Sequence, residues 1–498
     1  MPYRPHRSER IGHGVDKVEF LRLLGEHLKP GDLLSAEEDV RPYECDGLSA
    51  HRAVPWLVAL PDDLDQLRAV VRTCRTHGVP VVVRGAGTGL SGGALPLDNG
   101  VLLGLSKFRR IIEIDPANRQ ARVEPGVRNL AVSEAARRYG LYYAPDPSSQ
   151  IACSVGGNVA ENSGGVHCLK YGLTVHNLAA AKLLTMDGEL LELGGSAPDA
   201  PGYDLTAVIC GSEGLLGILV ELTLKLLPLP DAAHTVLAAF DSIEQAGRAV
   251  AEIIGAGLIP AGLEMMDNLA IRAAEQFVHA GYPIDAAALV LCELDGILPQ
   301  VEADRDRACA IFRMTGASSV RIAADPAERA RMWAGRKSAF PAVGRISPDY
   351  YCMDGTIPRR RLAEVLGAIG RMAKAYGLAV ANVFHAGDGN LHPLILYDAN
   401  RPGELEQAEA LGAEILELCV AVGGTITGEH GVGSEKIEQM CIQFSAAELN
   451  QFHRLKLAFD PAGLLNPGKA IPSLHRCAEF GAMHVRGGRL SHPDLDRY

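Results

Sequence analysis

The chain has 498 residues, enough material for about three domains of roughly 150 residues each, which excludes a small binding module. Hydrophobic residues make up 47% of it and charged residues 22%, as in folded globular proteins, so a disordered or fibrous chain is excluded. A formal net charge of -12 excludes nucleic acid as an expected partner, because such binding needs a positively charged surface.

The N-terminal residues and the apolar runs predict where the protein resides. Residues 1–14 are basic and polar and lack the apolar stretch of a secretory signal. The longest clean apolar run, Ala286 to Cys292, is only strand-sized, whereas a membrane span needs roughly 18 to 20 residues. We therefore expect a cytoplasmic protein with no transmembrane segment, peripheral at the inner membrane only through a partner.

Composition divides the chain into five segments, with Pro228 and Pro230 at the main boundary. In chain order they are an N-terminal arm (1–50), a glycine-rich region (51–230), a more helical region (231–455), a short segment punctuated by proline and glycine (456–475) and a polar tail (476–498). We expect the two large regions to be separate domains.

Local patterns in the glycine-rich region predict both helices and strands. Pro61-Asp62-Asp63 is typical of a helix start, and Gly78 ends that helix before a buried strand at 79–83. The apolar face of this helix comprises Leu64, Leu67, Val70, Val71 and Cys74. Further short strands are predicted at 101–105, 109–114, 120–123, 183–185 and 219–226.

The second region has a weak repeat of strand, helix and strand. A strand at 234–240 leads into a helix at 243–256, and a strand at 287–294 leads into a helix at 299–315. This order predicts ferredoxin-like units, so the fold class is α+β. An amphipathic helix is predicted near the end, at 446–457.

A glycine-rich loop follows the first predicted buried strand. Residues 87–92 satisfy G-x-G-x-x-G, and Glu113 lies about 20 residues on, as in NAD-binding Rossmann folds. That mechanism requires a helix N-terminus at the pyrophosphate, but Pro96 and Asp98 follow and predict a turn. The loop therefore favours a nest of backbone N–H groups that cradles a diphosphate, over a purely structural turn. The residues expected at the ligand are Arg84, Gly85, Gly87, Thr88, Gly89, Leu90 and Ser91.

Two more segments of small residues have no apolar periodicity that would explain them as core. Each alone is typical of a tight turn, but three such segments in one domain indicate a large dinucleotide laid across several loops. Their expected contact residues are Pro145, Ser148, Gly156, Asn158, Asn162 and Gly165 in the first segment, and Glu213, Gly217 and Ile218 in the second.

Histidines and a carboxylate form the second candidate site. His385 and His392 enclose an Ala-Gly-Asp-Gly-Asn-Leu stretch, and Gly428-Glu429-His430-Gly431 begins 36 residues after His392. Two histidines and a carboxylate with open positions suit a divalent metal such as zinc, manganese or iron. The alternative is a set of polar turns in which the histidines meet backbone groups.

The glycine-rich segments, together with Lys170-Tyr171-Gly172, resemble the flavin domain of the vanillyl-alcohol-oxidase, or PCMH-type, flavoproteins. The late loop 459–469 resembles that family's C-terminal return to the flavin. The resemblance implies FAD, with Tyr171, Gly172 and Asn466 among its contacts, and it makes 51–230 the FAD-binding domain and 231–455 a substrate, or cap, domain with the metal site. Family members often attach FAD covalently through a histidine, but the loop 84–93 contains none, so non-covalent FAD is expected.

Within that family the chain resembles the FAD-linked glycolate oxidase subunits and the D-lactate and D-2-hydroxyglutarate dehydrogenases. The resemblance implies that His385, His392 and Glu429 hold the metal and that His430 is the catalytic base. It also implies that Arg336 binds the substrate carboxylate, although a surface helix would also contain such an arginine. Relatives that take longer diacids have a lysine near 350–354, and none stands there, which favours a short substrate.

The expected function is FAD-dependent oxidation of a short 2-hydroxy acid, glycolate or D-lactate, to the 2-oxo acid. The metal would assist deprotonation of the hydroxyl, hydride would pass to flavin N5, and the electrons would go to a partner or a quinone. The expected partners are a second flavoprotein subunit and an iron-sulfur subunit, since the 11 cysteines include no C-x-x-C pair for a cluster in this chain. The alternatives are a D-2-hydroxyglutarate-type dehydrogenase, a non-catalytic FAD-binding scaffold subunit, and a metal-dependent hydrolase, which would leave the glycine-rich segments unexplained.

Overall fold

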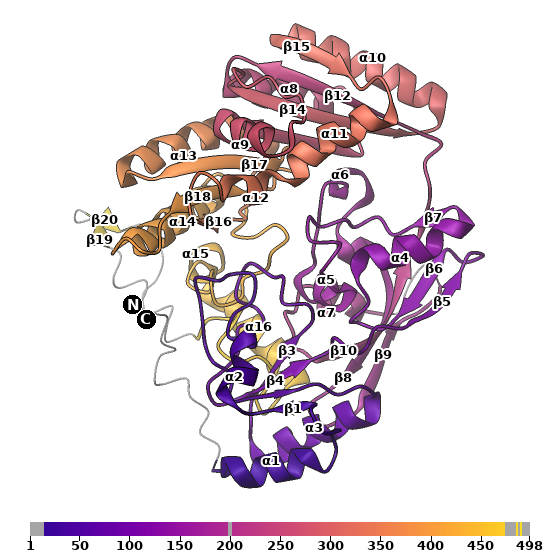
Figure 1. The fold of residues 1–498 in the computed structure, drawn as a ribbon, viewed down its shortest axis with the longest axis vertical. Coiled ribbons are helices and arrows are strands. Elements are labelled where there is room, and N and C mark those ends of the chain that lie inside the picture. The colour runs from indigo at the N-terminus through magenta and orange to yellow at the C-terminus, as the bar shows by residue number, and fades with distance from the viewer. Residues whose placement is uncertain (1–13, 198–201, 474–484, 487–488, 491–498) are drawn as a thin grey trace.

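The computed structural model describes residues 14–197, 202–473, 485–486 and 489–490. Figure 1 shows an N-terminal part below, built on two sheets, and a part above built on one large sheet. The start of the predicted arm and most of the predicted polar tail lie outside the described residues.

The first sheet follows the predicted strand-helix pattern. Helix α3 (Leu64–His77) begins at Asp63, whose side chain accepts a hydrogen bond from the Gln66 N–H, and ends at Gly78 in the left-handed region, as expected. Its apolar face packs on the sheet together with α1 (Lys17–Gly25). The strands, in spatial order, are β1 (Leu33–Leu34), β2 (Leu57–Ala59), β4 (Val101–Gly104) and β3 (Val81–Arg84), of which the last three run parallel.

The second sheet is wholly antiparallel. In spatial order its strands are β5 (Ile111–Asp115), β6 (Gln120–Val123), β10 (Ile218–Lys225), β8 (Leu178–Leu184) and β9 (Leu190–Gly194). The apolar residues of three helices complete its core, namely α4 (Asn129–Ala136), α5 (Val155–Glu161) and α7 (Leu205–Ile209). Helix α5 lies inside a stretch that we expected to be a loop, because buried Val155 and Val159 give it an apolar side despite its glycines.

The upper sheet has seven antiparallel strands. In spatial order they are β15 (Ala317–Ile322), β12 (Ala232–Phe240), β14 (Ala288–Gly296), β13 (Gly262–Asp267), β17 (Ala379–His385), β18 (Pro393–Tyr397) and β16 (Asp349–Cys352). Its first four strands, with two helices, form a complete ferredoxin-like unit, and the last three form a second unit that lacks one edge strand. The predicted α+β fold and repeat are therefore confirmed.

Helices cover both faces of this sheet, since successive strand residues such as Val236 and Leu237 belong to different cores. One face carries α8 (Ile243–Gly255), α10 (Leu298–Met314), α13 (Leu362–Tyr376) and α14 (Glu404–Ala421), and the other carries α9 (Asn268–Val278), α11 (Pro326–Lys337) and α12 (Ala339–Val343).

The chain then returns to the lower part. After α16 (Ala446–Phe459), the Val81 N–H donates to the Leu464 carbonyl and the Asn466 N–H donates to the Val81 carbonyl, each at 2.8 Å. Figure 1 shows this yellow segment among the indigo elements. The remaining short elements are α2 (Glu37–Val40), η2 (Arg41–Tyr43), η3 (Arg137–Tyr139), β7 (Leu141–Tyr142), α6 (Cys168–Tyr171), η4 (Thr174–Asn177), β11 (Leu227–Pro228), η5 (Arg359–Arg361), α15 (Met440–Gln443), β19 (Val485–Arg486) and β20 (Arg489–Leu490).

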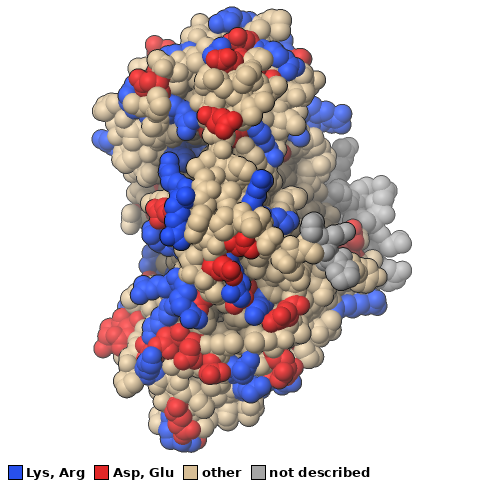
Figure 2. Space-filling model, turned by 90° about the vertical axis from the view of Figure 1, so that its right-hand side faces the viewer, with Lys and Arg blue, Asp and Glu red and all other residues tan. Residues whose placement is uncertain are grey.

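The surface gives no sign of one dominant charge on the face seen in Figure 2, where basic and acidic side chains are interspersed over both parts. Among the described helices, none combines the length and the apolar character needed to cross a bilayer.

Candidate active site

A cavity of about 460 Å³ lies where the two parts meet, a volume typical of ligand sites. The glycine-rich loops of the lower part line one portion of it. Arg336, His385, His392, Glu429 and His430, the residues expected to act on the substrate, line the other. The structure thus brings together two sets of residues that are far apart in the sequence.

About half of the expected cofactor contacts line this cavity: Gly85, Gly87, Thr88, Gly89, Leu90, Ser148, Gly156, Asn158, Glu213 and Gly217. The others are not among its lining residues: Arg84, Ser91, Pro145, Asn162, Gly165, Tyr171, Gly172, Ile218 and Asn466. Several of them hold the loops in place. The Arg84 guanidinium donates to the Tyr43 and Cys45 carbonyls, and the Asn466 amide donates to the Gly93 and Glu213 carbonyls.

The first glycine-rich loop has the properties of an anion nest. From Ala86 to Gly93, no backbone N–H donates a hydrogen bond to another described residue. A side chain added at Gly89 would have only the Glu161 carboxylate within 4 Å, at 3.9 Å, so its space opens to the cavity. A side chain at Gly87 would instead collide with the Arg84 guanidinium, where φ is also +70°. The uncovered donors and the open cradle fit a diphosphate.

The candidate metal ligands form a tight buried group. His385 ends β17, His392 immediately precedes β18, and Glu429 lies in the loop after α14. The Glu429 Oε1 atom is 3.3 Å from His385 Nε2 and 3.1 Å from His392 Nε2. Neither ring nitrogen of His392 has a hydrogen-bond partner among the described residues. Buried imidazole nitrogens that lie beside carboxylates without forming a well-aligned hydrogen bond to them fit a divalent cation.

The electrostatics of this group also favour a positive charge. Burial would raise the pKa of Glu429, but the neighbouring His385 and His392 rings hold it well below its usual range. Burial would lower the pKa of His385, yet the Glu264 and Glu429 carboxylates raise it well above its usual range. The site therefore stabilises either a protonated imidazole or a bound cation between its carboxylates.

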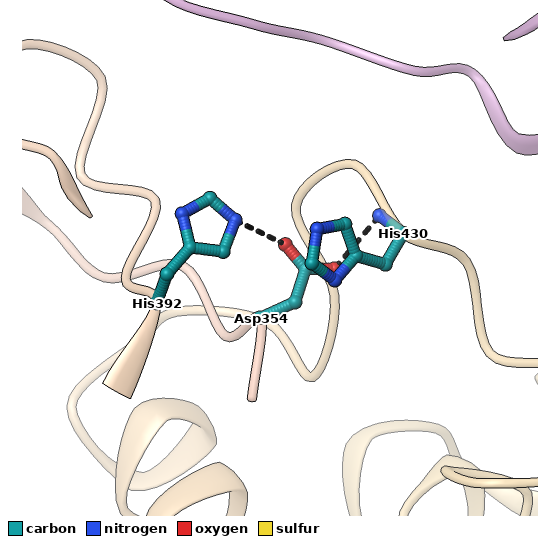
Figure 3. A group of neighbouring side chains, drawn as sticks. All are labelled: Asp354, His392 and His430. Atoms are coloured by element: carbon teal, nitrogen blue, oxygen red, sulfur yellow. Dashed lines mark hydrogen bonds and ion pairs between the residues drawn. The ribbon is translucent and has the colours of Figure 1, made fainter. Parts of the chain in front are cut away.

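A second group, Asp354, His392 and His430, shares His392 with the first (Figure 3). Asp354 is fully buried two residues after the end of β16 and is 3.6 Å from His392 Nε2. Its carboxylate already accepts hydrogen bonds from the backbone N–H groups of Gly428, Glu429 and His430 and from the side chains of Asn390 and Thr427. With its acceptor sites used in this way, Asp354 organises the loop, and the group around Glu429 is the better metal site.

His430 and Arg336 lie beside the metal group. The His430 ring stacks on the His392 ring with centroids 4.9 Å apart, and its Nδ1 has no hydrogen-bond partner among the described residues. Burial lowers the pKa of His430 to about 4, so the ring is neutral at pH 7 and can accept a proton. Arg336, on α11, is 1% exposed and is not a surface residue. Its Nη2 pairs with Glu264 Oε2 at 2.6 Å, and its Nε has no hydrogen-bond partner among the described residues.

Glu429 and His430 are neighbours in the chain, so both side chains can point toward one centre only if the chain bends there. Directly after the pair, Gly431 adopts φ of +82°, and a side chain there would meet the Glu161 carboxylate at 2.0 Å. Gly428 does not adopt positive φ, and it is small because Asn390 lies against it.

Sequence reasoning missed Asp354, Glu264 and the lining residues Ser154, Gly157 and Phe340. The signal for Asp354 was a single acid directly after the short run Tyr350 to Met353. The structure also brings Lys436 to 3.3 Å from Asp354, although no lysine stands near it in sequence. Lys436 donates to the Gly431 carbonyl and does not line the cavity.

Comparison with known proteins identifies the class. Residues 55–194 match the FAD binding domain family, and residues 229–470 match the C-terminal domain of FAD linked oxidases. The chain belongs to the FAD-linked oxidase family, which confirms the expected FAD-dependent oxidoreductase.

Individual relatives within this family are named for the oxidation of 2-hydroxy acids. The chain is 63% identical to glycolate oxidase subunit GlcD of Escherichia coli K12, over 97% of both chains, and 30% identical to D-lactate dehydrogenase of Anaerostipes hadrus, over 89% of this chain and 95% of that protein. Substrate-bound p-cresol methylhydroxylase shares the fold, with a TM-score of 0.78 at 17% identity over 92% of this chain and 97% of that one. The expected PCMH-type fold is confirmed.

Proposed function

We propose that this protein oxidises a short 2-hydroxy acid, glycolate or D-lactate, to the 2-oxo acid with non-covalently bound FAD. The observation that carries the proposal is one cavity lined by both the glycine-rich loops and the group Arg336, His385, His392, Glu429 and His430. The relatives named for glycolate and D-lactate chemistry support the substrate class.

A divalent metal, zinc, manganese or iron, would be held by His385, His392 and Glu429. Charge balance supports this. Glu264 pairs with Arg336, and Asp354 pairs with Lys436, but Glu429 pairs only with histidines in the described part of the chain. Glu429 is thus the buried carboxylate that a cation would neutralise. The metal's chemistry is to lower the pKa of a bound hydroxyl.

The protein groups then have distinct roles. Arg336, which lines the cavity, would bind the substrate carboxylate through its guanidinium group. His430 would take the hydroxyl proton, and because its pKa is about 4 it needs an acidified hydroxyl, which is what a Lewis acid supplies. FAD, when bound, accepts the hydride from C2.

The names of the relatives, which refer to glycolate and D-lactate, support a short substrate over a D-2-hydroxyglutarate-type diacid. Lys436 is engaged with Asp354 and the Gly431 carbonyl and is absent from the cavity lining, so it offers no cation to a second carboxylate. A purely scaffolding subunit would not need His430, Glu429 and both other histidines around one cavity.

Anaerobic flavin bleaching tests the proposal. Purified protein is mixed with glycolate, D-lactate, L-lactate or D-2-hydroxyglutarate, before and after chelator treatment. We expect glycolate or D-lactate to bleach the flavin only in metal-loaded protein. Equal bleaching after complete metal removal would refute the metal role, and no bleaching by any 2-hydroxy acid would refute the substrate class.

We further propose that the electrons leave through partner chains, a second flavoprotein subunit and an iron-sulfur subunit, and that any association with the inner membrane is made by those chains. The designation of the Escherichia coli relative as a subunit supports such an assembly. Co-purification of the tagged protein from its native host would identify the partners.

A further inference from the structure

We propose that Glu264 is a positioning residue that holds the proposed metal ligand His385 and the proposed substrate arginine Arg336 together. This inference rests on the proposed function, and it adds a residue that makes metal binding and carboxylate binding depend on one buried side chain.

The geometry is direct. Glu264 lies on β13, is 1% exposed, and faces His385 across the strand pair, in register with it. Its Oε1 is 2.8 Å from His385 Nδ1, and its Oε2 is 2.6 Å from Arg336 Nη2. One carboxylate therefore uses a different oxygen for each partner.

The contact with His385 decides which ring nitrogen is free. A proton on Nδ1 is donated to Glu264, so Nε2, the nitrogen 3.3 Å from Glu429, keeps its lone pair for a metal. A carboxylate behind a metal-binding histidine fixes the ring orientation and raises its basicity.

The contact with Arg336 fixes a buried guanidinium beside the cavity. Arg336 is almost fully buried, and Glu264 is the carboxylate that pairs with it among the described residues. The pair therefore holds in place an arginine that lines the cavity, where its guanidinium would meet a substrate carboxylate.

Glutamine at this position cannot serve both partners. Its single carbonyl oxygen can accept from His385 or from Arg336, while its amide group only donates. Glu264→Gln should therefore weaken both functions in a protein that still binds FAD.

The test uses the full chain loaded with FAD. Mn²⁺ affinity of chelator-treated protein is measured by calorimetry, and oxalate affinity of the metal-free protein is measured by the change in flavin absorbance. We expect Glu264→Gln to weaken Mn²⁺ binding by about 10 to 100-fold, with weaker oxalate binding as well and unchanged FAD content.

Glu293→Gln is the matched control. Glu293 is a buried carboxylate on the neighbouring strand β14 that accepts from the Trp333 and Thr235 side chains and has no contact with His385 or Arg336 among the described residues. We expect this variant to keep wild-type affinity for both probes. If Glu264→Gln does not fold, Glu264→Asp replaces it in the test. Aspartate keeps the charge but is too short to reach both partners, so we expect smaller losses of Mn²⁺ and oxalate affinity.

The inference is overturned if either affinity stays at the wild-type value in a folded Glu264 variant, or if Glu293→Gln loses both equally. A wild-type protein that binds no Mn²⁺ would instead refute the metal part of the proposed function, whatever the Glu264 variants do.

Discussion

Replacing Asp354 with asparagine should destabilise the loop that carries Glu429 and His430. Asp354 is fully buried, and its carboxylate accepts hydrogen bonds from three consecutive backbone N–H groups, those of Gly428, Glu429 and His430, at 2.9 to 3.2 Å. It also lies 3.3 Å from the ammonium group of Lys436, which is fully buried. Asparagine keeps the shape, removes the charge and turns an amide donor toward other donors.

The expected loss follows from these contacts. A hydrogen bond to a charged group contributes about 1.5 to 3 kcal/mol to stability. Removing one partner of a buried ion pair, so that the other charge stays buried and unpaired, costs about 3 to 5 kcal/mol. Lys436 keeps its bond to the Gly431 carbonyl, so part of that cost is relieved. We expect the free energy of unfolding to fall by about 3 to 5 kcal/mol, and Mn²⁺ affinity to fall at least tenfold because Glu429 is no longer held.

Denaturant unfolding followed by circular dichroism measures the first effect, and calorimetric Mn²⁺ titration measures the second. The double variant Asp354→Asn/Lys436→Met should regain part of the stability, because no unpaired buried cation remains although Glu435 loses its ion pair with Lys436, while its Mn²⁺ affinity stays low. Asp388→Asn is the control and should keep wild-type stability and Mn²⁺ affinity: Asp388 is partly buried, lies outside the ligand groups and the cavity lining, and accepts a hydrogen bond from the Asn390 N–H, and burial raises its pKa to about 6. An Asp354→Asn protein with wild-type stability and Mn²⁺ affinity would refute the reasoning.

Three further substitutions test other parts of the site. Gly89→Val should lower FAD occupancy without loss of fold, since its side chain would enter the cavity. The control Gly370→Val, with nothing within 4 Å of the added carbon, should keep full flavin absorbance. Full FAD occupancy in both variants would show that the loop is not part of the cofactor site. His430→Gln should retain metal and FAD but slow anaerobic flavin reduction by roughly 10² to 10⁴-fold, while Glu429→Gln should lose metal. Metal analysis and stopped-flow flavin absorbance measure these effects. Flavin reduction at the wild-type rate by His430→Gln would contradict the role of His430 as the base. Burial would lower the pKa of His167, but two facing carboxylates raise it to about 10, so the stabilisation that His167 provides is present below about pH 6.5 and is lost as pH rises through 10. The difference in unfolding free energy between wild type and His167→Gln should therefore shrink over that range. A constant difference would refute this prediction.

The parts of the fold set by local interactions could be predicted from the sequence. Helix α3 needs only its Asp63 cap, its apolar face and Gly78, all within one segment. The first ferredoxin-like unit was equally visible, because strand and helix alternate at regular spacing. Helix α5 was missed because its glycines hide the apolar side that Val155 and Val159 form.

The candidate site divides in the same way. His385, His392, Glu429 and His430 stand in two short motifs, so residue types and spacing sufficed to group them. Glu264 was invisible because it lies 121 residues from its partner His385. Its position opposite that histidine is a property of strand pairing in the sheet.

The loop that carries Glu429 and His430 is held from both parts of the molecule. On the side of the upper sheet, Asp354 binds its backbone at 428–430. On the side of the FAD-binding region, the Ser91 hydroxyl donates to the His430 carbonyl, and Glu213 accepts from the two backbone N–H groups at 432–433, at 2.7 Å each. A shift of either part would therefore move the proposed base and the proposed metal ligand together. This explains why Ser91, though outside the cavity lining, belongs to the functional structure: it sets the position of the chemistry relative to the loop that would cradle the cofactor.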